Sequence, residues 1–383
     1  MRLLEVLPSV DPQEGGTAEA VRQLGLELDK SGVNVDVATM DDPQDSFVSG
    51  YPLSLVPLGP STGKYGYAKR LVPWLKANVA KYDAVIVNGV WQYHSFAVWR
   101  ASQGRVTPYY VFPHGMLDPW FRHTYPLKHL KKWLYWPWAE YRVLRDARAV
   151  LFTSEEERRL ARQSFWLYKA NERIVALGIY VPPKNAVNLT AQFLAAHPCL
   201  KGRRFILYMG RIHEKKGCDL LVQAFAHVAR REPNLHLVVA GPDQTGLLPK
   251  LKNLAMDLGV ADRVSWPGML RDDLKWGAFY SAEAFALPSH QENFGIAIAE
   301  AMSCGLPVLI SDKVNVWREI DADGAGFVAS DSFEGTAKSL GAWLDLDRQG
   351  RIDMASRALI CFQRRFTASA MAKSLLRTLE QVK

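Results

Sequence analysis

Residues 284–302 read AFALPSHQENFGIAIAEAM. The apolar run Ala284–Leu287 predicts a short buried strand, the polar residues 288–294 predict a loop, and the run from Gly295 predicts a helix. Strand, loop and helix in this order form the unit of a parallel sheet that helices cover on both faces. Ligands of such sheets bind beyond the carboxyl ends of the strands, so this loop is a candidate site.

The same order of elements recurs in both halves of the chain. Helical periodicity appears at 18–28, from 155 onward and at 296–303. Because strands and helices alternate twice over, the sequence predicts an α/β chain of two Rossmann-like, doubly wound domains that face each other across a cleft. The apolar runs that predict the strands lie at 3–7, 33–39, 84–87, 106–112, 149–152, 205–209, 235–240, 284–287 and 307–311.

A segment of low periodicity separates the two halves. It runs from 180 to 202 and contains Pro182, Pro183 and Pro198. We therefore predict a first domain at 1–180, a linker at 181–202 and a second domain at 203–362. The amphipathic end of the chain predicts a helix within 363–383, which we expect to pack back on the first domain.

The composition is that of a folded protein large enough for two domains. Of 383 residues, 48% are hydrophobic and 22% are charged, which argues against disorder. The net charge of +8 favours phosphates, nucleic acid or anionic lipid without choosing among them. Since no nucleic-acid-binding motif is recognisable, we expect no nucleic-acid partner.

Cysteine usage and hydropathy bear on location. The four cysteines form no C-x-x-C pair, so we interpret them as buried thiols in a reducing compartment. The sequence shows neither a leader segment nor an apolar run long enough to span a bilayer. We therefore expect a cytoplasmic location.

The loop and helix at 288–303 have the features of a phosphate site. The first amides of a helix lack partners within the helix and its dipole favours negative charge, while Gly295 permits close approach of a ligand. Glu292 before the helix and Glu300 in its second turn can reach the two ends of a ligand and bind paired hydroxyl groups. Glu300 lies among apolar neighbours, so its carboxylate needs a partner.

A second motif, GRIHEKKG at 210–217, follows another apolar run. Arg211 and Lys216 on one strand-to-helix loop can converge on a diphosphate, the arginine as a planar fork and the lysine as a point charge. A solvated turn before a helix is the alternative for this motif taken alone.

Together the two motifs resemble glycosyltransferase family 4, the retaining nucleotide-sugar enzymes of the GT-B fold. The resemblance rests on G-R-x(4)-K-G at 210–217, E-x(7)-E at 292–300, and the run EAMSCGLPV at 300–308, where Ser303 replaces an alanine of the family pattern. It covers nearly the whole chain and is strongest from 205 to 328.

The resemblance implies roles for individual residues. Arg211 and Lys216 are expected to bind the donor diphosphate, Glu300 the ribose, and Glu292 the transferred sugar. We expect His114, Glu292, Arg211 and Lys216 to form the catalytic set. The expected donor-binding set is Gly16, Gly241, Met269, Leu270, Asn293, Phe294, Gly295, Ile296 and Glu300.

Two of these residues lie in the first half. Gly15-Gly16 follows the first strand, and in the family the equivalent pair lies beside the donor; a plain tight turn is the alternative. His114 follows the strand at 106–112 and resembles the family histidine that contacts the transferred sugar. A structural histidine is the alternative there.

The segment 120–148 is rich in basic and aromatic residues. Such a segment suits an anionic membrane surface, which would place the protein peripherally on the inner face of the membrane. A core helix with inward aromatics and outward lysines is the alternative.

By resemblance, we expect the chain to move a hexose with retention from a UDP- or GDP-linked donor to a hydroxyl, on a glycan or lipid-linked acceptor of surface-polysaccharide assembly. Asp321-Ala322-Asp323 looks like a metal-binding D-x-D, but it lies in a polar, Gly-rich turn, so we expect no metal and no other cofactor. A nucleotide-sugar epimerase and a non-catalytic nucleotide- or glycan-binding protein remain as alternatives.

Overall fold

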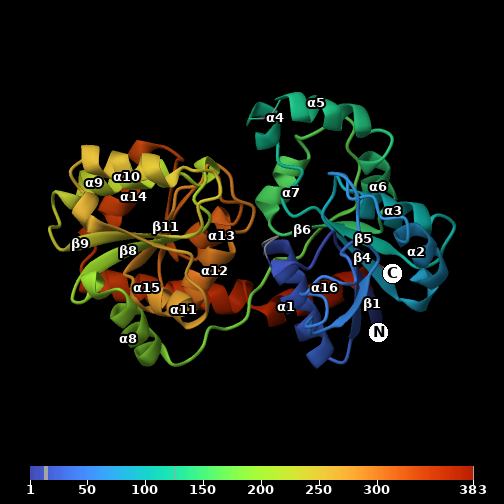
Figure 1. Ribbon diagram of the computed structural model, residues 1–383, viewed down its shortest axis with the longest axis horizontal. Helices are drawn as coiled ribbons and strands as arrows, with labels where there is room; N and C mark the ends of the chain where they lie inside the picture. The colour runs from blue at the N-terminus through green and yellow to red at the C-terminus, as the bar shows by residue number, and fades with distance from the viewer. Residues whose placement is uncertain (13–15, 125, 383) are drawn as a thin grey trace. The chain divides into compact units, whose positions relative to one another are not determined.

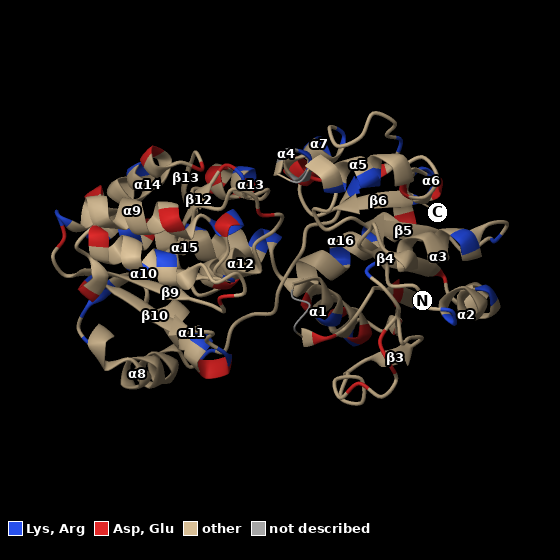
Figure 2. Ribbon diagram, turned by 45° about the horizontal axis from the view of Figure 1, so that its top comes forward, with Lys and Arg blue, Asp and Glu red and all other residues tan. Residues whose placement is uncertain are grey.

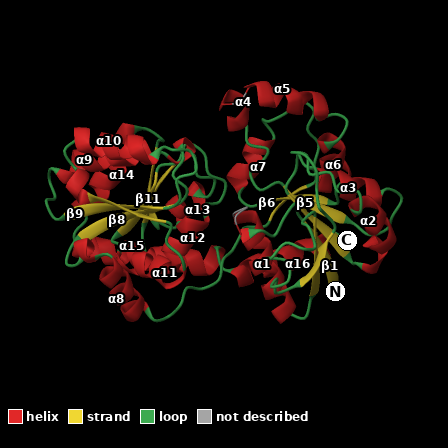
Figure 3. Cartoon of the chain, in the orientation of Figure 1, coloured by secondary structure: helices red, strands yellow, loops and turns green. Residues whose placement is uncertain are grey.

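The computed structural model describes residues 1–12, 16–124 and 126–382. The chain divides into two compact units. Unit 1 comprises Met1–Ile179 and Thr367–Lys383, and unit 2 comprises Tyr180–Phe366. Each unit is an α/β structure built on its own sheet (Figure 3).

The sheet of unit 1 has the strand order β3-β2-β1-β4-β5-β6-β7, and every pairing between its described strands is parallel. The strands β4, β5 and β6 are buried along their whole length, as expected for a sheet covered on both faces. The bounds are β1 (Arg2–Val6), β2 (Asn34–Thr39), β3 (Ser54–Pro57), β4 (Ala84–Asn88), β5 (Tyr109–Phe112), β6 (Ala149–Phe152) and β7 (Glu172–Ile174).

Helices cover both faces of this sheet. α1 and α16 lie side by side on one face, and α2, α3 and α6 lie together on the other (Figure 1). The helices are α1 (Gly16–Lys30), α2 (Leu71–Asn78), α3 (Tyr93–Ser102), α4 (Trp120–Thr124), α5 (Pro126–Tyr135), α6 (Glu140–Asp146), α7 (Glu155–Ala161) and α16 (Ala368–Gln381), with a short 3-10 turn η2 (Val79–Lys81).

The sheet of unit 2 has the order β10-β9-β8-β11-β12-β13, again parallel throughout the described strands. Its central strands β8 and β11 are neighbours although 74 residues of chain separate Met209 from the start of β11. The bounds are β8 (Arg204–Met209), β9 (Leu235–Ala240), β10 (Val264–Gly268), β11 (Ala284–Leu287), β12 (Val308–Ser311) and β13 (Gly326–Ala329).

The helices of unit 2 form two layers. α9, α10 and α14 lie on one face of the sheet, and α8, α11, α12 and α15 lie on the other (Figure 1). The helices are α8 (Ala186–Ala196), α9 (Cys218–Ala229), α10 (Leu248–Asp257), α11 (Asp272–Ser281), α12 (Ile296–Ser303), α13 (Trp317–Ala322), α14 (Phe333–Asp345) and α15 (Arg348–Arg365), with 3-10 turns η3 (Pro198–Leu200), η4 (Glu214–Lys216) and η5 (Ala261–Arg263).

The segment predicted as a linker is part of unit 2. It contains α8, which packs on α11 and buries Leu189 and Phe193 completely or nearly so. Gly277 of α11 lets the two helices approach, because a Cβ there would overlap the carbonyl oxygen of Leu189. The prediction of a linker was wrong. It was based on Pro182 and Pro183, which precede α8, although Leu189 and Phe193 are four residues apart and so have the spacing of a helix.

The end of the chain returns to unit 1, as expected, but the return begins at Thr367 and not at 363. Residues 348–365 belong to the long helix α15 of unit 2, and Phe366 ends it. The helix α16 then buries Met371, Leu375 and Leu379 on its inner face. The amphipathic pattern at the end of the chain thus corresponds to α16.

Two smaller expectations need correction. Cys199 is exposed, whereas Cys218 and Cys361 are buried and Cys304 is partly buried; all four are free thiols. Asp321 and Ala322 form the last turn of α13 and do not lie in an irregular turn.

Among the described residues, the helices are all too short or too polar to cross a bilayer.

Candidate functional site

Two loops of unit 2 meet at the carboxyl ends of the neighbouring strands β8 and β11. One is the loop 210–217 after β8, and the other is the loop 288–295 after β11. The main-chain N–H of His290 donates to the carbonyl oxygen of Lys215 at 2.9 Å. Beside this bond, the ammonium of Lys216 forms an ion pair with the carboxylate of Glu292. The structure therefore brings together two motifs that the sequence places 76 residues apart.

Gly217 makes this close approach possible. Its φ of +64° lies in the left-handed region, and a Cβ there would overlap the carbonyl oxygen of Pro288. Gly241 after β9 lies equally close to the main chain of Gly210, and the N–H of Ile212 donates to the carbonyl oxygen of Pro242 at 2.9 Å. Three loops thus form one continuous rim at this edge of the sheet.

The Lys216–Glu292 pair is largely withdrawn from solvent, since each side chain is only 15% exposed. Burial lowers the pKa of Lys216 to about 7, and the neighbouring cations Lys215 and Arg211 act in the same direction. The carboxylate of Glu292 opposes this effect because an adjacent negative charge favours the ammonium form. Lys216 therefore needs an anionic partner to keep its charge near neutral pH.

The main chain around Glu292 is fixed on both sides. Its N–H donates to the carbonyl oxygen of Lys313 at 3.0 Å, and its carbonyl oxygen accepts from the N–H of Asn315 at 2.9 Å. The side chain of Asn315 also donates to the Oδ1 of Asn293 at 3.1 Å. These bonds hold the loop before α12 in one conformation.

The helix α12 begins immediately after Gly295, at Ile296, where the sequence predicted it. Gly295 has a φ of +72°, and a Cβ there would crowd Ile298 and Glu292. The side chain of Phe294 turns inward and packs edge-on against Phe366, with ring centroids 5.6 Å apart. Phe294 can therefore contribute its main-chain amide to a ligand but not its ring.

Glu300 has the partner that its apolar surroundings require. Lys275 of α11 donates to the Oε1 of Glu300 at 2.8 Å, and the side chains are 26% and 14% exposed. The ammonium of Lys275 also lies 4.4 Å from the ring centroid of Trp276. Lys275 gives no signal in the sequence, because it is a lone lysine in the first turns of a helix and no motif surrounds it.

The remaining predicted residues of unit 2 differ in exposure. Arg211 is exposed, and its guanidinium makes a long contact of 3.5 Å with the Oε1 of Gln244. Met269 is 55% exposed, whereas Leu270 is 9% exposed and faces the interior. Arg211 and Met269 are thus available to a ligand at the rim.

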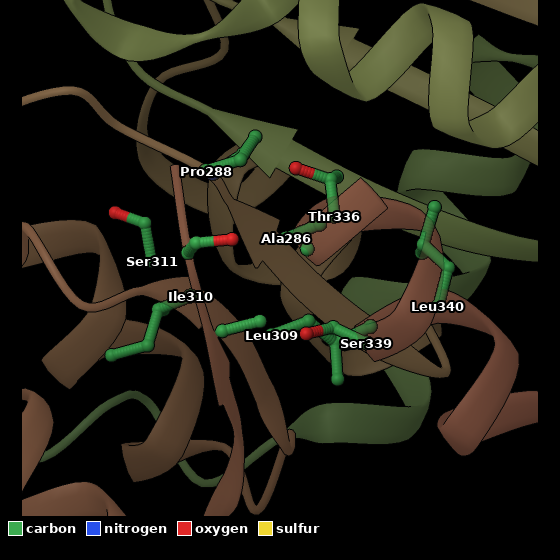
Figure 4. A pocket seen from close by; sticks show the side chains of 11 residues that line it. Ala286, Pro288, Leu309, Ile310, Ser311, Thr336, Ser339 and Leu340 are labelled. Atoms are coloured by element: carbon green, nitrogen blue, oxygen red, sulfur yellow. The ribbon is translucent and has the colours of Figure 1, made fainter. Parts of the chain in front are cut away.

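A small cavity lies behind this edge, between β11, β12 and α14 (Figure 4). Its lining is mainly apolar, and its polar members are Ser311 of β12, Ser330 after β13, and Thr336 and Ser339 of α14. It contains no charged side chain, so it does not carry the chemistry of the rim.

In unit 1, His114 follows β5 as predicted and has a left-handed φ of +50°. Its Nε2 lies 2.9 Å from the Oδ1 of Asn88, and its ring stacks on Phe112 at 5.3 Å. Desolvation lowers the pKa of His114 to about 4, so the imidazole is neutral near pH 7.

The loop after His114 is fixed by a buried carboxylate. Glu157 of α7 accepts from the N–H of Gly115 at 2.5 Å and from both the N–H and the hydroxyl of Thr153 at 2.7 and 2.6 Å. This carboxylate joins the loop after β5 to the loop after β6. Gly16 is the exposed first residue of α1, and Gly15 lies outside the described residues.

The segment 120–148 divides into an exposed and a buried part. Trp136 is fully buried, and α6 buries Glu140, Val143 and Leu144. The helix α5, by contrast, has no buried residue. The segment thus has a core part and an exposed part, and Tyr125 lies outside the described residues.

One aspartate of the D-x-D sequence, Asp323, is paired with arginines. Asp323 accepts from Arg365 at 2.8 Å and also pairs with Arg364. Within the parts of the chain that the structure describes, no cluster of three or more His, Cys, Asp or Glu side chains could hold a metal ion.

The chemistry of the unit 2 rim is that of an anion site flanked by carboxylates. Arg211 and Lys216 supply positive charge, and the start of α12 supplies main-chain donors and its dipole. Glu292 and Glu300 lie at opposite ends of this region of the sequence and can accept hydrogen bonds from hydroxyl groups. A phosphorylated sugar or a nucleotide has both features.

In comparison with known proteins, both units match models of glycosyltransferase families. The family model "Glycosyl transferases group 1" matches residues 192–357, and the model "Glycosyl transferase 4-like domain" matches residues 15–178. The matched regions correspond to units 2 and 1 and together span most of the chain.

Among curated relatives, the D-inositol 3-phosphate glycosyltransferase of Mycobacteroides abscessus is 29% identical over 327 residues, which are 77% of this chain and 69% of that protein. The mannosylfructose-phosphate synthase of Agrobacterium fabrum is 34% identical over 123 residues, 30% of this chain. The latter alignment spans 27% of the synthase.

Among solved structures, Anabaena HepE in complex with UDP and glucose matches with a TM-score of 0.78 and 18% identity, and the match covers 100% of both chains. This likeness extends over the full length and establishes the two-domain GT-B fold that the sequence predicted.

We expect Gly217→Ala to destabilise unit 2 more than Gly246→Ala. Both glycines have a positive φ, which costs an alanine roughly 1–2 kcal/mol. Only at Gly217 must the carbonyl of Pro288 also move, because the space around Gly246 is open. Denaturant unfolding of the two variants measures the difference, and equal free energies of unfolding would contradict the packing of the two loops.

Proposed function

Because this chain belongs to the glycosyltransferases of family 4, we propose that it transfers a hexose from a nucleotide diphosphate-sugar to a hydroxyl group with retention of anomeric configuration. The observation that carries the proposal is the meeting of Lys216 with Glu292 beside the first turn of α12. One group there binds phosphate and the other binds sugar hydroxyls. The donor is UDP- or GDP-linked.

The diphosphate binds Arg211, Lys216 and the first amides of α12, at Phe294, Gly295 and Ile296. An incoming phosphate supplies the negative charge that Lys216 requires, since burial otherwise lowers its pKa to about 7. Lys216 can then exchange its contact with Glu292 for one with phosphate. The exchange leaves the carboxylate of Glu292 free for the hydroxyls of the transferred sugar.

The nucleoside lies toward the other end of α12. Glu300 binds the ribose hydroxyls, and Lys275 holds its carboxylate in place from α11. Gly241, Met269 and Leu270 frame the base, Leu270 through its main chain because its side chain is buried. Asn293 is held by Asn315 and fixes the loop that carries the donor amides. Gly16 lies at the start of α1 and permits close approach of the donor.

The reaction breaks the bond between the anomeric carbon and the donor phosphate oxygen. Negative charge grows on the departing diphosphate, where Arg211, Lys216 and the dipole of α12 stabilise it. The acceptor oxygen forms its bond to the anomeric carbon on the same face, and its proton passes to the departing phosphate oxygen. Glu292 positions the sugar and does not act as a general base, and His114 contacts the sugar as a neutral imidazole.

Transfer needs no divalent metal on this proposal. The positive charge of Arg211 and Lys216 serves the leaving group, and Asp323 of the D-x-D sequence is already paired with Arg364 and Arg365. The acceptor is a glycan or lipid-linked intermediate of surface-polysaccharide assembly. The protein works in the cytoplasm.

The membrane side of the proposal rests on α5. Four of its apolar side chains are exposed: Leu127 at 79%, Leu130 at 55%, Leu134 at 61% and Trp133 at 43%. Trp166 (67% exposed) lies beside Trp133, and Trp138 is 70% exposed. Arg122, Lys128 and Lys131 are exposed on the same segment, and Figure 2 shows basic residues on α5.

An exposed apolar face bordered by cations suits the interface of an anionic bilayer, where apolar side chains enter the lipid and lysines meet the headgroups. We propose that α5 docks unit 1 peripherally on such a surface. A lipid-linked acceptor would be presented there.

We expect Arg211→Ala to lower kcat by about 10²-fold or more, because it removes charge stabilisation that develops in the transition state. Arg230→Ala is the matched control, since Arg230 is an exposed arginine at the end of α9. The assay measures transfer of radiolabelled hexose from nucleotide diphosphate-sugars to an acceptor extract.

A near-normal rate for Arg211→Ala would refute the assignment. Conversion of the sugar without any acceptor would identify an epimerase instead. Binding of nucleotide-sugar without turnover under all acceptor conditions would indicate a binding protein.

We expect the protein to co-sediment with vesicles that contain anionic phospholipid and to dissociate as salt is raised, because charge attraction is screened. Leu130→Glu should weaken this binding, while Val187→Glu, at an 85% exposed position of α8, should not. Equal binding to neutral and anionic vesicles, or no effect of Leu130→Glu, would contradict docking through α5.

A further inference from the structure

We infer that Glu5 and Asn88 are positioning residues that determine which nitrogen of His114 carries the imidazole proton. The inference rests on the proposed function only in giving His114 a sugar contact. The assignment of the proton itself follows from two buried side chains of unit 1, Glu5 and Asn88, and from the partly buried His114.

The three residues come from three neighbouring strands. Glu5 lies in β1, Asn88 ends β4, and His114 follows β5. In the parallel register Glu5 is opposite Ile86, and Asn88 is opposite Phe112. The side chains therefore form a line across the carboxyl ends of adjacent strands.

The line is hydrogen-bonded throughout. The Nδ2 of Asn88 donates to the Oε2 of Glu5 at 2.6 Å, and the Oδ1 of Asn88 lies 2.9 Å from the Nε2 of His114. An amide NH2 only donates and an amide oxygen only accepts. In the structure the NH2 end of Asn88 faces Glu5 and the oxygen end faces His114, so in this arrangement Nε2 is the protonated nitrogen. Nδ1 is then the nitrogen that accepts a hydrogen bond.

Burial keeps both ends of the line uncharged. Glu5 is fully buried, which raises its pKa to about 8, and Asn88 is 2% exposed. No partner for the Oε1 of Glu5 is found among the described residues, so the carboxyl proton can reside there and leave Oε2 as the accepting carbonyl oxygen. Removal of the ring from water likewise lowers the pKa of His114 to about 4.

Other groups hold the three residues in place without competing for Nε2. The Nε2 of His94 bonds the main-chain oxygen of Asn88 at 2.9 Å, and burial lowers the pKa of His94 to about 4. Tyr51 is a titratable group close enough to sense the charge of Glu5, and burial raises the pKa of Tyr51. The stacking of His114 on Phe112 fixes the ring plane.

The position of the proton determines whether His114 accepts or donates a hydrogen bond toward the sugar. A neutral His114 with a proton on Nε2 can accept a hydrogen bond from a sugar hydroxyl through Nδ1, and it cannot serve as an acid. Glu5 never touches the sugar, but it selects this state through Asn88. A carboxyl within the buried part of β1, where its neighbours Leu3, Leu4 and Val6 are apolar, is the sequence signal for such a role.

The test is nitrogen NMR of the imidazoles in the full-length protein labelled with 15N, near neutral pH and without any donor. His114→Gln identifies the His114 signals by their loss. We expect His114 to be neutral, with the proton on Nε2 and a lone pair on Nδ1. A protonated imidazole, or a proton on Nδ1, would overturn the inference without any further variant.

Variants then separate positioning from folding. Glu5→Leu removes the acceptor that holds the NH2 end of Asn88, so we expect His114 to become a mixture of both tautomers and kcat to fall while the KM for the donor stays. Asn88→Asp keeps an accepting oxygen toward Nε2 and should retain the tautomer. Asp29→Asn, at an exposed position of α1, is the control.

An unchanged single tautomer in Glu5→Leu would contradict the role of Glu5. Because these spectra need no substrate, they remain valid if the proposed transfer is wrong. Conversely, a chain that transfers hexose normally but has the proton on Nδ1 would leave the proposed function intact and exclude this inference.

Discussion

The contact between Lys216 and Glu292 is the interaction on which the site of unit 2 depends. It exists because β8 and β11 are adjacent and because Gly217 lets one loop lie against the carbonyl of Pro288. The pair is nearly out of solvent, so each charge has to be matched. In the structure the two side chains satisfy this requirement for each other. On the proposed function, a diphosphate meets Lys216 and a sugar meets Glu292, so each charge keeps a partner.

The same principle recurs at the second carboxylate. Glu300 is matched by Lys275 from a different helix, so both glutamates of the motif are held by lysines before any ligand arrives. Pre-formed pairs fix the carboxylate positions and reduce the ordering that ligand binding would otherwise require. In unit 1 the side chains of Glu5, Asn88 and His114 are likewise held in position, here by hydrogen bonds between uncharged groups.

The sequence predicted those elements whose local pattern is strong. The strands at 149–152, 235–240 and 284–287 and the helix 296–303 agree with the structure residue by residue, because apolar runs bounded by glycine, proline or polar loops determine their ends locally. The helix α8 was missed because prolines precede it. The strands β3 and β7 were missed because they are short edge strands with only partial burial.

The site shows the same division between local and distant information. Arg211, Lys216, Glu292 and Glu300 lie in motifs that single them out in the sequence, whereas Lys275 and Glu5 contact partners 25 and 83 residues away. Only the fold brings such partners together. The segment 120–148 was ambiguous for a related reason: composition cannot tell that Trp136 is core while Trp133 and Trp138 face solvent.

The central claim is that the rim of unit 2 binds a nucleotide diphosphate through Arg211 and Lys216. Isothermal titration calorimetry with UDP, GDP, ADP and inorganic phosphate, on the natural chain and on Lys216→Met, tests it most directly. The account predicts saturable binding of one nucleoside diphosphate, weaker binding of phosphate alone, and a large loss of affinity in the variant. Absence of binding by every nucleotide, or equal affinity in Lys216→Met, would contradict it.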